Sequence, residues 1–109
     1  MINLSAATDC LNLRGPDSRG IFNEERVGLG HRRLSIIDTT SDGRQPMTDD
    51  SRRYVIVFNG EIFNFKELRQ KLENTGTSFF SHSDTEVLLK LYIKEGADCL
   101  NQLNGFFAF

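Results

Sequence analysis

Apolar positions along the chain switch between strand-like and helix-like spacing. Residues 53–58 (RYVIVF) are β-branched or aromatic almost throughout, which predicts a buried central strand. The helical pattern follows over residues 64–74, where Leu68 and Leu72 share one face. Asn64 with Glu67 three residues later resembles a capping box at the start of this helix, and Gly76 is expected to end it.

A second helix is expected after Ser83, which can cap it, with Glu86 at the capping-box position. Its apolar stripe consists of Val87, Leu88, Leu91 and Tyr92. Gly96 is expected to end this helix, and residues 97–103 suggest a further helical turn.

The N-terminal part of the chain predicts a short helix followed by strands. Residues 3–13 predict a short helix capped by Ser5, and Gly15 and Pro16 are expected to stop it. The other expected segments are strands over residues 19–23, 27–31 and 78–81, a turn over 23–25, an extended stretch over 33–37, a polar loop over 38–50 and a buried strand over 105–109.

Composition narrows the class of protein. A chain of 109 residues makes one domain at most, and 39% apolar with 26% charged residues fits a globular protein. A net charge of −2 gives nucleic acid no basic surface to bind, and no apolar run approaches the ~20 residues of a membrane span. Cys10 and Cys99 lack metal-ligand spacing, so we expect no metal site and a reduced, cytoplasmic protein.

Residues at three places in the chain admit either a structural or a chemical role. Asn59-Gly60-Glu61 suits a type I′ hairpin turn, or a strand end that presents an amide, an open N–H and a carboxylate. Arg33 and the residues after it form an ordinary β segment or the lining of a pocket. Asp84 in the first turn of a helix stabilises the helix dipole, whatever else it binds.

Other candidate catalytic residues have weak support. His31 and His82 are not expected to act as catalytic bases. Ser35 and Ser83 lack the G-x-S-x-G setting of a serine hydrolase nucleophile, so that class of enzyme is disfavoured.

Four motifs occur in an order and spacing that resemble a known family. They are RGPDSRG (residues 14–20), GLGHRRLSIID (28–38), VIVFNGEIFN (55–64) and SHSDTE (81–86), and QPM (45–47) adds to them. Together they resemble the class II, N-terminal-nucleophile glutamine amidotransferase domain of glutamine-hydrolysing asparagine synthetases, over nearly the whole chain. The resemblance implies an α+β fold. Residues 1–109 would form a single partial domain of a four-layer αββα sandwich that lacks its first strand and its C-terminal strands.

The resemblance also implies a role for each matching residue. Arg33 would grip the α-carboxylate of glutamine with its planar fork, and Asn59 with Gly60 would form the oxyanion hole. Glu61 and Asp84 would bind the α-ammonium group. The backbone of Leu34, Ser35, Ile36 and Ile37 would line the pocket, and the RGPD turn would be structural.

One departure from the family bears on activity. The family begins with a cysteine whose free amino group is the base, followed by a Gly-Ile-Ala-Gly strand, whereas this chain begins Met1-Ile2-Asn3 and Cys10 lies in the predicted helix. We therefore expect these 109 residues to be a glutaminase-domain fragment that does not hydrolyse glutamine as it stands. An excised piece of a longer protein, a truncated or recombined gene product and a non-catalytic module all fit.

The resemblance implies partners as well. In the family, the domain supplies ammonia to an asparagine-synthetase-like ATP-dependent ligase, so ATP and magnesium belong to that second domain and this one needs no cofactor. The alternative function is a glutamine-binding or assembly module without catalysis. Because the missing strands would leave sheet edges unpaired, we also expect self-association.

Overall fold

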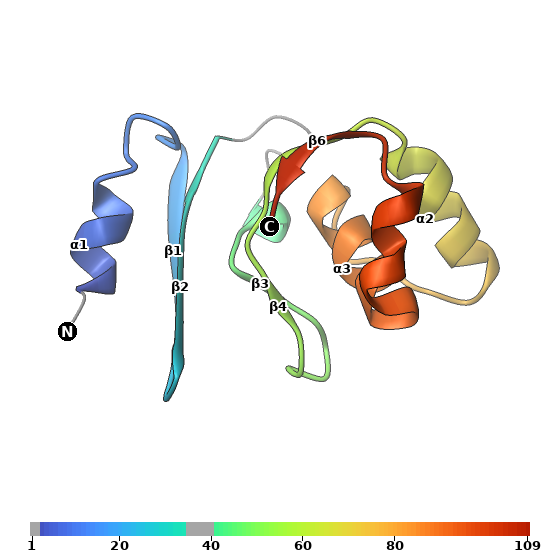
Figure 1. The fold of residues 1–109 in the computed structure, drawn as a ribbon, viewed down its shortest axis with the longest axis horizontal. Helices are drawn as coiled ribbons and strands as arrows, with labels where there is room; N and C mark the ends of the chain where they lie inside the picture. Colours follow the sequence, from blue (N-terminus) through green and yellow to red (C-terminus); the bar gives the residue numbers. More distant parts are fainter. Residues whose placement is uncertain (1–2, 35–40) are drawn as a thin grey trace.

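The computed structural model describes residues 3–34 and 41–109. This part of the chain contains both helices and short strands, and the strands pair in antiparallel fashion (Figure 1). The elements are α1 (Leu4–Asp9), β1 (Ser18–Glu24), β2 (Val27–Arg33), the 3-10 helix η1 (Ser41–Gly43), β3 (Met47–Thr48), β4 (Val55–Ile56), β5 (Asn59–Ile62), α2 (Phe65–Asn74), α3 (Asp84–Glu95), the 3-10 helix η2 (Gly96–Gln102) and β6 (Gly105–Ala108).

The N-terminal part is a hairpin with a helix beside it. Strands β1 and β2 pair from Ser18↔Arg33 to Glu24↔Val27, so the chain turns at residues 25–26 rather than at 23–25. Helix α1 lies along this hairpin on the side away from the other elements (Figure 1). The mixed α and β character expected from the sequence is confirmed.

The predicted limits of the first helix were wrong at both ends. Asn3 caps α1, since its Oδ1 accepts from the Ala6 N–H at 3.1 Å, while Ser5 lies inside the helix and its hydroxyl pairs with Arg19. The helix ends at Asp9, and the chain continues in turns to residue 14.

The second half of the structure corrects the interpretation of Asn59-Gly60 as a turn. These residues begin strand β5, which pairs with β6 from Asn59↔Ala108 to Ile62↔Gly105. Of the predicted central strand, only Val55–Ile56 forms a strand, β4. It pairs with β3, which lies within the segment predicted as a loop. Residues 78–81 form no strand, and β6 is largely exposed rather than buried, with Phe106 61% exposed.

The two predicted long helices are present, but their starts differ. Ser83 caps α3 as expected, because its Oγ accepts from the Glu86 N–H at 3.1 Å. Asn64 precedes α2 without a side-chain cap bond. Its amide instead donates to the Gln102 carbonyl at 2.8 Å and accepts from the Asn104 N–H at 2.9 Å, which ties α2 to the chain that leads into β6.

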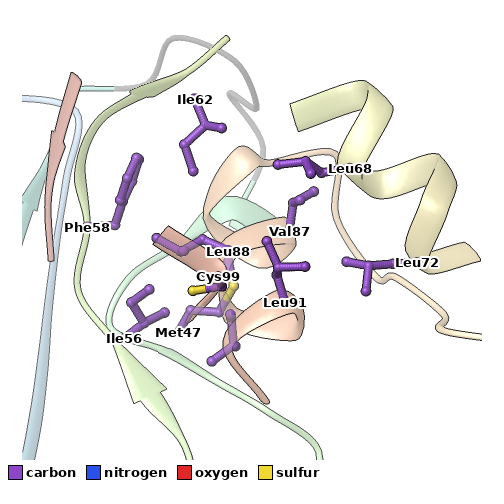
Figure 2. Close-up of a cluster of buried hydrophobic side chains, with 11 residues drawn as sticks. Met47, Ile56, Phe58, Ile62, Leu68, Leu72, Val87, Leu88, Leu91 and Cys99 are labelled. Atoms are coloured by element: carbon purple, nitrogen blue, oxygen red, sulfur yellow. The ribbon is translucent and has the colours of Figure 1, made fainter. Parts of the chain in front are cut away.

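The hydrophobic core lies between helices α2 and α3 and strands β3 to β5 (Figure 2). Tyr92, predicted for the apolar stripe of α3, is 40% exposed and meets Tyr54 edge to face. The buried apolar residues are Met47, Ile56, Phe58, Ile62, Leu68, Leu72, Val87, Leu88, Leu89, Leu91 and Cys99.

The hairpin joins this core region through a close backbone approach. A Cβ atom at Gly20 would lie 1.9 Å from the Gln45 carbonyl oxygen, so only glycine allows β1 to reach the segment before β3. The contact brings the C-terminal end of β2 near β5 and α3. Within the described residues, none of the helices has the length and apolarity that crossing a bilayer requires.

Candidate functional site

A cavity of about 590 Å³ opens between the hairpin, strand β5 and the start of α3. It brings together six of the predicted site residues, while Ser35, Ile36 and Ile37 lie outside the described residues. The six are Arg33, Leu34, Asn59, Gly60, Glu61 and Asp84.

Arg33 is the last residue of β2 and is 8% exposed. Its backbone carbonyl accepts from the Asp17 N–H at 2.8 Å, and Pro16 forms an isolated parallel bridge with it. The Gly15 carbonyl accepts from Arg32 Nε at 2.9 Å. The RGPD segment therefore packs against the end of β2 and holds the backbone from which the Arg33 guanidinium extends.

Strand β5 and the start of α3 each contribute one carboxylate to the cavity, Glu61 and Asp84. Asp84 is the first residue of α3 and is 6% exposed, and its Oδ2 accepts from the Ile62 N–H of β5 at 3.0 Å. Burial raises the pKa of Asp84, backbone N–H donors oppose that rise, and the charge of Glu61 adds to it. Glu61 and Asp84 therefore lie close enough to repel each other, and a cation between them would relieve the repulsion.

The raised pKa of Asp84 predicts a pH dependence of folding. A carboxyl group whose pKa is higher in the folded state binds more protons there, so its contribution to stability falls as pH rises from its ordinary value of 3.8 through the raised value. Asp84→Asn keeps an acceptor for the Ile62 N–H and removes this titration. We expect the free energy of unfolding, measured with urea, to fall less between pH 4 and pH 7 in Asp84→Asn than in wild type.

The exposed Asp50 provides the matched control, Asp50→Asn. That variant should follow the wild-type pH profile. Parallel profiles for Asp84→Asn and wild type would show that burial of Asp84 imposes no such pH dependence.

Asn59 and Gly60 open strand β5 at the edge of the cavity. Asn59 is exposed, so its amide is accessible to a ligand. Gly60 has φ +135°, and a Cβ there would lie 2.0 Å from the Phe106 carbonyl oxygen of β6. Backbone geometry thus requires glycine at this position, independently of any role in catalysis.

Two buried side chains that line the cavity were not among the predicted site residues. His31 is 5% exposed, and its Nε2–H donates to the Phe58 carbonyl at 3.0 Å. Burial lowers the pKa of His31, which favours the neutral ring. Gln45 accepts from the Phe58 N–H at 2.5 Å and donates to Thr85 Oγ1 at 3.1 Å. Gln45 lies in the QPM motif and His31 in the GHRR segment, but neither motif indicates which groups these side chains contact.

The remaining nucleophile and base candidates either do not line the cavity or are engaged in hydrogen bonds with the protein. His82 is exposed and is not among the residues that line the cavity. The Ser83 hydroxyl lies at the cavity but bonds to the Glu86 N–H and to Ser81 Oγ. Neither cysteine lines the cavity, since Cys99 is buried in the core and Cys10 is exposed near α1. Residues 3–34 and 41–109 contain no group of three metal-ligating side chains.

Comparison with known proteins decides the family. A family model described as "Glutamine amidotransferase domain" matches residues 2–109. The chain belongs to this glutamine amidotransferase family. The resemblance carried by the four motifs is therefore confirmed at the level of the family.

Several asparagine synthetases are similar to this amidotransferase domain. Asparagine synthetase [glutamine-hydrolyzing] 1 of Bacillus subtilis is 51% identical over 96 residues, which cover 88% of this chain and 15% of that protein. Asparagine synthetase B [glutamine-hydrolyzing] of Escherichia coli is 41% identical over 96 residues, covering 88% of this chain and 17% of that protein. Amidase chry2 of Gibberella zeae is 37% identical over 108 residues, which cover 97% of this chain and 16% of that protein. The chain thus spans about a sixth of the length of these relatives.

Proposed function

We propose that the cavity binds the amino-acid head of glutamine. Arg33 binds the α-carboxylate through parallel N–H groups, while Glu61 and Asp84 bind the α-ammonium. Asn59 and Gly60 donate to the carboxamide oxygen, and more strongly when it becomes an oxyanion. The observation that supports this proposal is that Arg33 lines the same cavity as the carboxylates of Glu61 and Asp84, a set of charges that complements a zwitterion.

The hydrolytic step needs a thiol that the cavity of this chain does not contain. In the proposed reaction, a cysteine thiolate adds to the carboxamide carbon and the oxyanion forms at Asn59 and Gly60. The amide nitrogen takes up the proton that the thiol gave up and leaves as ammonia, and water then hydrolyses the resulting thioester to glutamate and the free thiol. We propose that the 109-residue chain binds glutamine without hydrolysing it. With an amino-terminal cysteine strand, it would supply ammonia to an ATP-dependent asparagine-forming domain, the partner that the family resemblance implies.

Calorimetric titration of the chain with glutamine tests the binding proposal. Saturable binding of L-glutamine, absent with D-glutamine, is the expected result. No heat with either enantiomer would contradict it and would favour the alternative of an assembly module without a ligand site.

A chain extended at its N-terminus by a Cys-Gly-Ile-Ala-Gly strand tests the catalytic proposal. This chain should release ammonia from glutamine, and the same extension with serine in place of cysteine should not. Equal ammonia release from both would exclude the thiol as the nucleophile.

We also propose that the small sheets are parts of a four-layer αββα sandwich. The three described sheets have two strands each, and β6 exposes Phe106 (61%) and leaves Phe109 49% exposed. Unpaired edges with exposed aromatic side chains favour pairing with a second copy.

Light scattering tests this self-association. It should show dimers whose fraction grows with protein concentration and falls in Phe106→Lys, whereas a monomer at every concentration would contradict self-association through the sheet edges.

A further inference from the structure

We propose that Gln45 and His31 form a clamp on the backbone of Phe58 that positions Asn59 and Gly60 for the carboxamide end of glutamine. This inference rests on the proposed function, because it assigns positioning residues to the proposed oxyanion site. Neither residue touches the proposed oxyanion itself. Both act through the peptide groups that flank Phe58.

The clamp occupies a gap between two strands. Strand β4 ends at Ile56 and β5 begins at Asn59, so Phe58 belongs to neither ladder. Its N–H donates to Gln45 Oε1 at 2.5 Å, and its carbonyl accepts from His31 Nε2 at 3.0 Å. Gln45, His31 and Phe58 are 7%, 5% and 3% exposed. Two side chains from distant segments thus satisfy both backbone groups of a buried residue.

The Phe58 carbonyl belongs to the same peptide group as the Asn59 nitrogen. Fixing this planar unit therefore limits the direction in which the Asn59 side chain leaves the backbone. Gln45 also donates to Thr85 Oγ1 at 3.1 Å, next to Asp84 at the start of α3. Gln45 is therefore held in place by the first turn of α3 while its Oε1 accepts from Phe58.

The chemistry of the ring assigns the tautomer of His31. A carbonyl oxygen can only accept, so the proton lies on Nε2 and Nδ1 carries the lone pair. Nδ1 is buried and makes no hydrogen bond of good geometry in the described part of the chain, although the Asn59 side chain interacts with the ring and acts to raise the pKa of His31 against the larger effect of burial. Such a group is costly unless another interaction repays it, which supports a functional reason for histidine at this position.

Comparing the affinities of each variant for glutamine and for norvaline distinguishes a positioning role from a general effect on folding. Norvaline keeps the amino-acid head but ends in a methyl group, so it reports on the head-binding residues alone. Gln45→Met and His31→Phe remove one clamp bond each and keep most of the side-chain volume. We expect each variant to bind glutamine about tenfold more weakly, the equivalent of one hydrogen bond, with unchanged affinity for norvaline. His31→Gln, which restores an N–H donor, should recover most of the loss.

Thr8→Val is the matched control. Thr8 is 2% exposed, its Oγ1 donates to the Leu4 carbonyl at 2.7 Å, and it lies outside the cavity lining. This variant loses a buried hydrogen bond but should keep the wild-type preference for glutamine. Equal weakening of glutamine and norvaline in the clamp variants, or no weakening of either, would overturn the inference.

Amide hydrogen exchange tests the clamp without any ligand. In Gln45→Met, the Phe58 N–H should exchange at least tenfold faster, while amides of α2 and α3 keep their rates. If wild type binds neither amino acid, the proposed function fails, and this exchange result alone decides the clamp. An unchanged Phe58 exchange rate would overturn it.

Discussion

Replacing Arg33 by alanine is expected to weaken glutamine binding at least 100-fold. The residue is 8% exposed at the end of β2 and faces the cavity. Two charge-assisted hydrogen bonds to one carboxylate together contribute about 3 kcal/mol or more, which corresponds to that factor. Arg33→Lys should bind more weakly than wild type as well, because an ammonium group cannot reproduce the planar fork.

Calorimetry with L-glutamine measures this effect, and urea unfolding establishes that each variant is folded. Arg53→Ala is the matched control, since Arg53 is exposed in the turn before β4 and does not line the cavity. Its affinity should equal that of wild type. A folded Arg33→Ala chain that binds glutamine within threefold of wild type would remove Arg33 from the proposed site.

Replacing Glu86 by alanine is expected to lower the free energy of unfolding by about 3 kcal/mol or more. The side chain is fully buried in α3. Its carboxylate accepts from the Phe80 N–H at 3.0 Å, the Ser81 N–H at 2.7 Å and the Ser81 hydroxyl at 2.7 Å. Alanine would leave the two buried Ser81 donors and the part-buried Phe80 N–H without their acceptor, together with a cavity.

Urea denaturation monitored by circular dichroism measures the loss. Glu67→Ala, at an exposed position in the first turn of α2, should change the free energy of unfolding by no more than about 0.5 kcal/mol. Glu86→Gln should lie between wild type and Glu86→Ala because the amide oxygen still accepts hydrogen bonds. A loss below about 1 kcal/mol in Glu86→Ala would mean that water replaces the carboxylate at low cost.

The position of Glu86 also bears on the site. It holds residues 80–81 against the first turn of α3, and Arg69 supports the same segment by donating to the Ser81 carbonyl at 2.7 Å. Asp84 follows three residues later, at the helix start that points into the cavity. Stability in this loop and the placement of a proposed ligand-binding carboxylate are therefore expected to change together.

Much of the local structure followed from neighbours in the sequence. The Ser83 cap, the Leu68 and Leu72 face of α2 and the hairpin of β1 and β2 depend on contacts within a few residues, so short-range patterns indicate them. The motifs also indicated the family and singled out residues that line one cavity. The roles of Arg33, Asn59 and Asp84 stay predictions until binding is measured.

Other features depend on partners far along the chain. Asn59-Gly60 has the composition of a hairpin turn, yet it forms a strand because β6, more than 40 residues later, pairs with it. Asn64 has the composition of a cap, yet its amide bonds to residues 102 and 104. In both cases a tertiary hydrogen bond competes successfully with a local one, and the local sequence contains no information about that distant partner.

The sequence by itself determined the family, the two long helices and the residue types available for binding an amino acid. Only the tertiary structure decided which groups meet: the clamp of Gln45 and His31 on Phe58, the acceptors around Glu86 and the burial that raises the pKa of Asp84. The physical reason is that desolvation and hydrogen-bond pairing depend on every segment that packs against a group, whereas helix and strand patterns depend on residues only a few positions away.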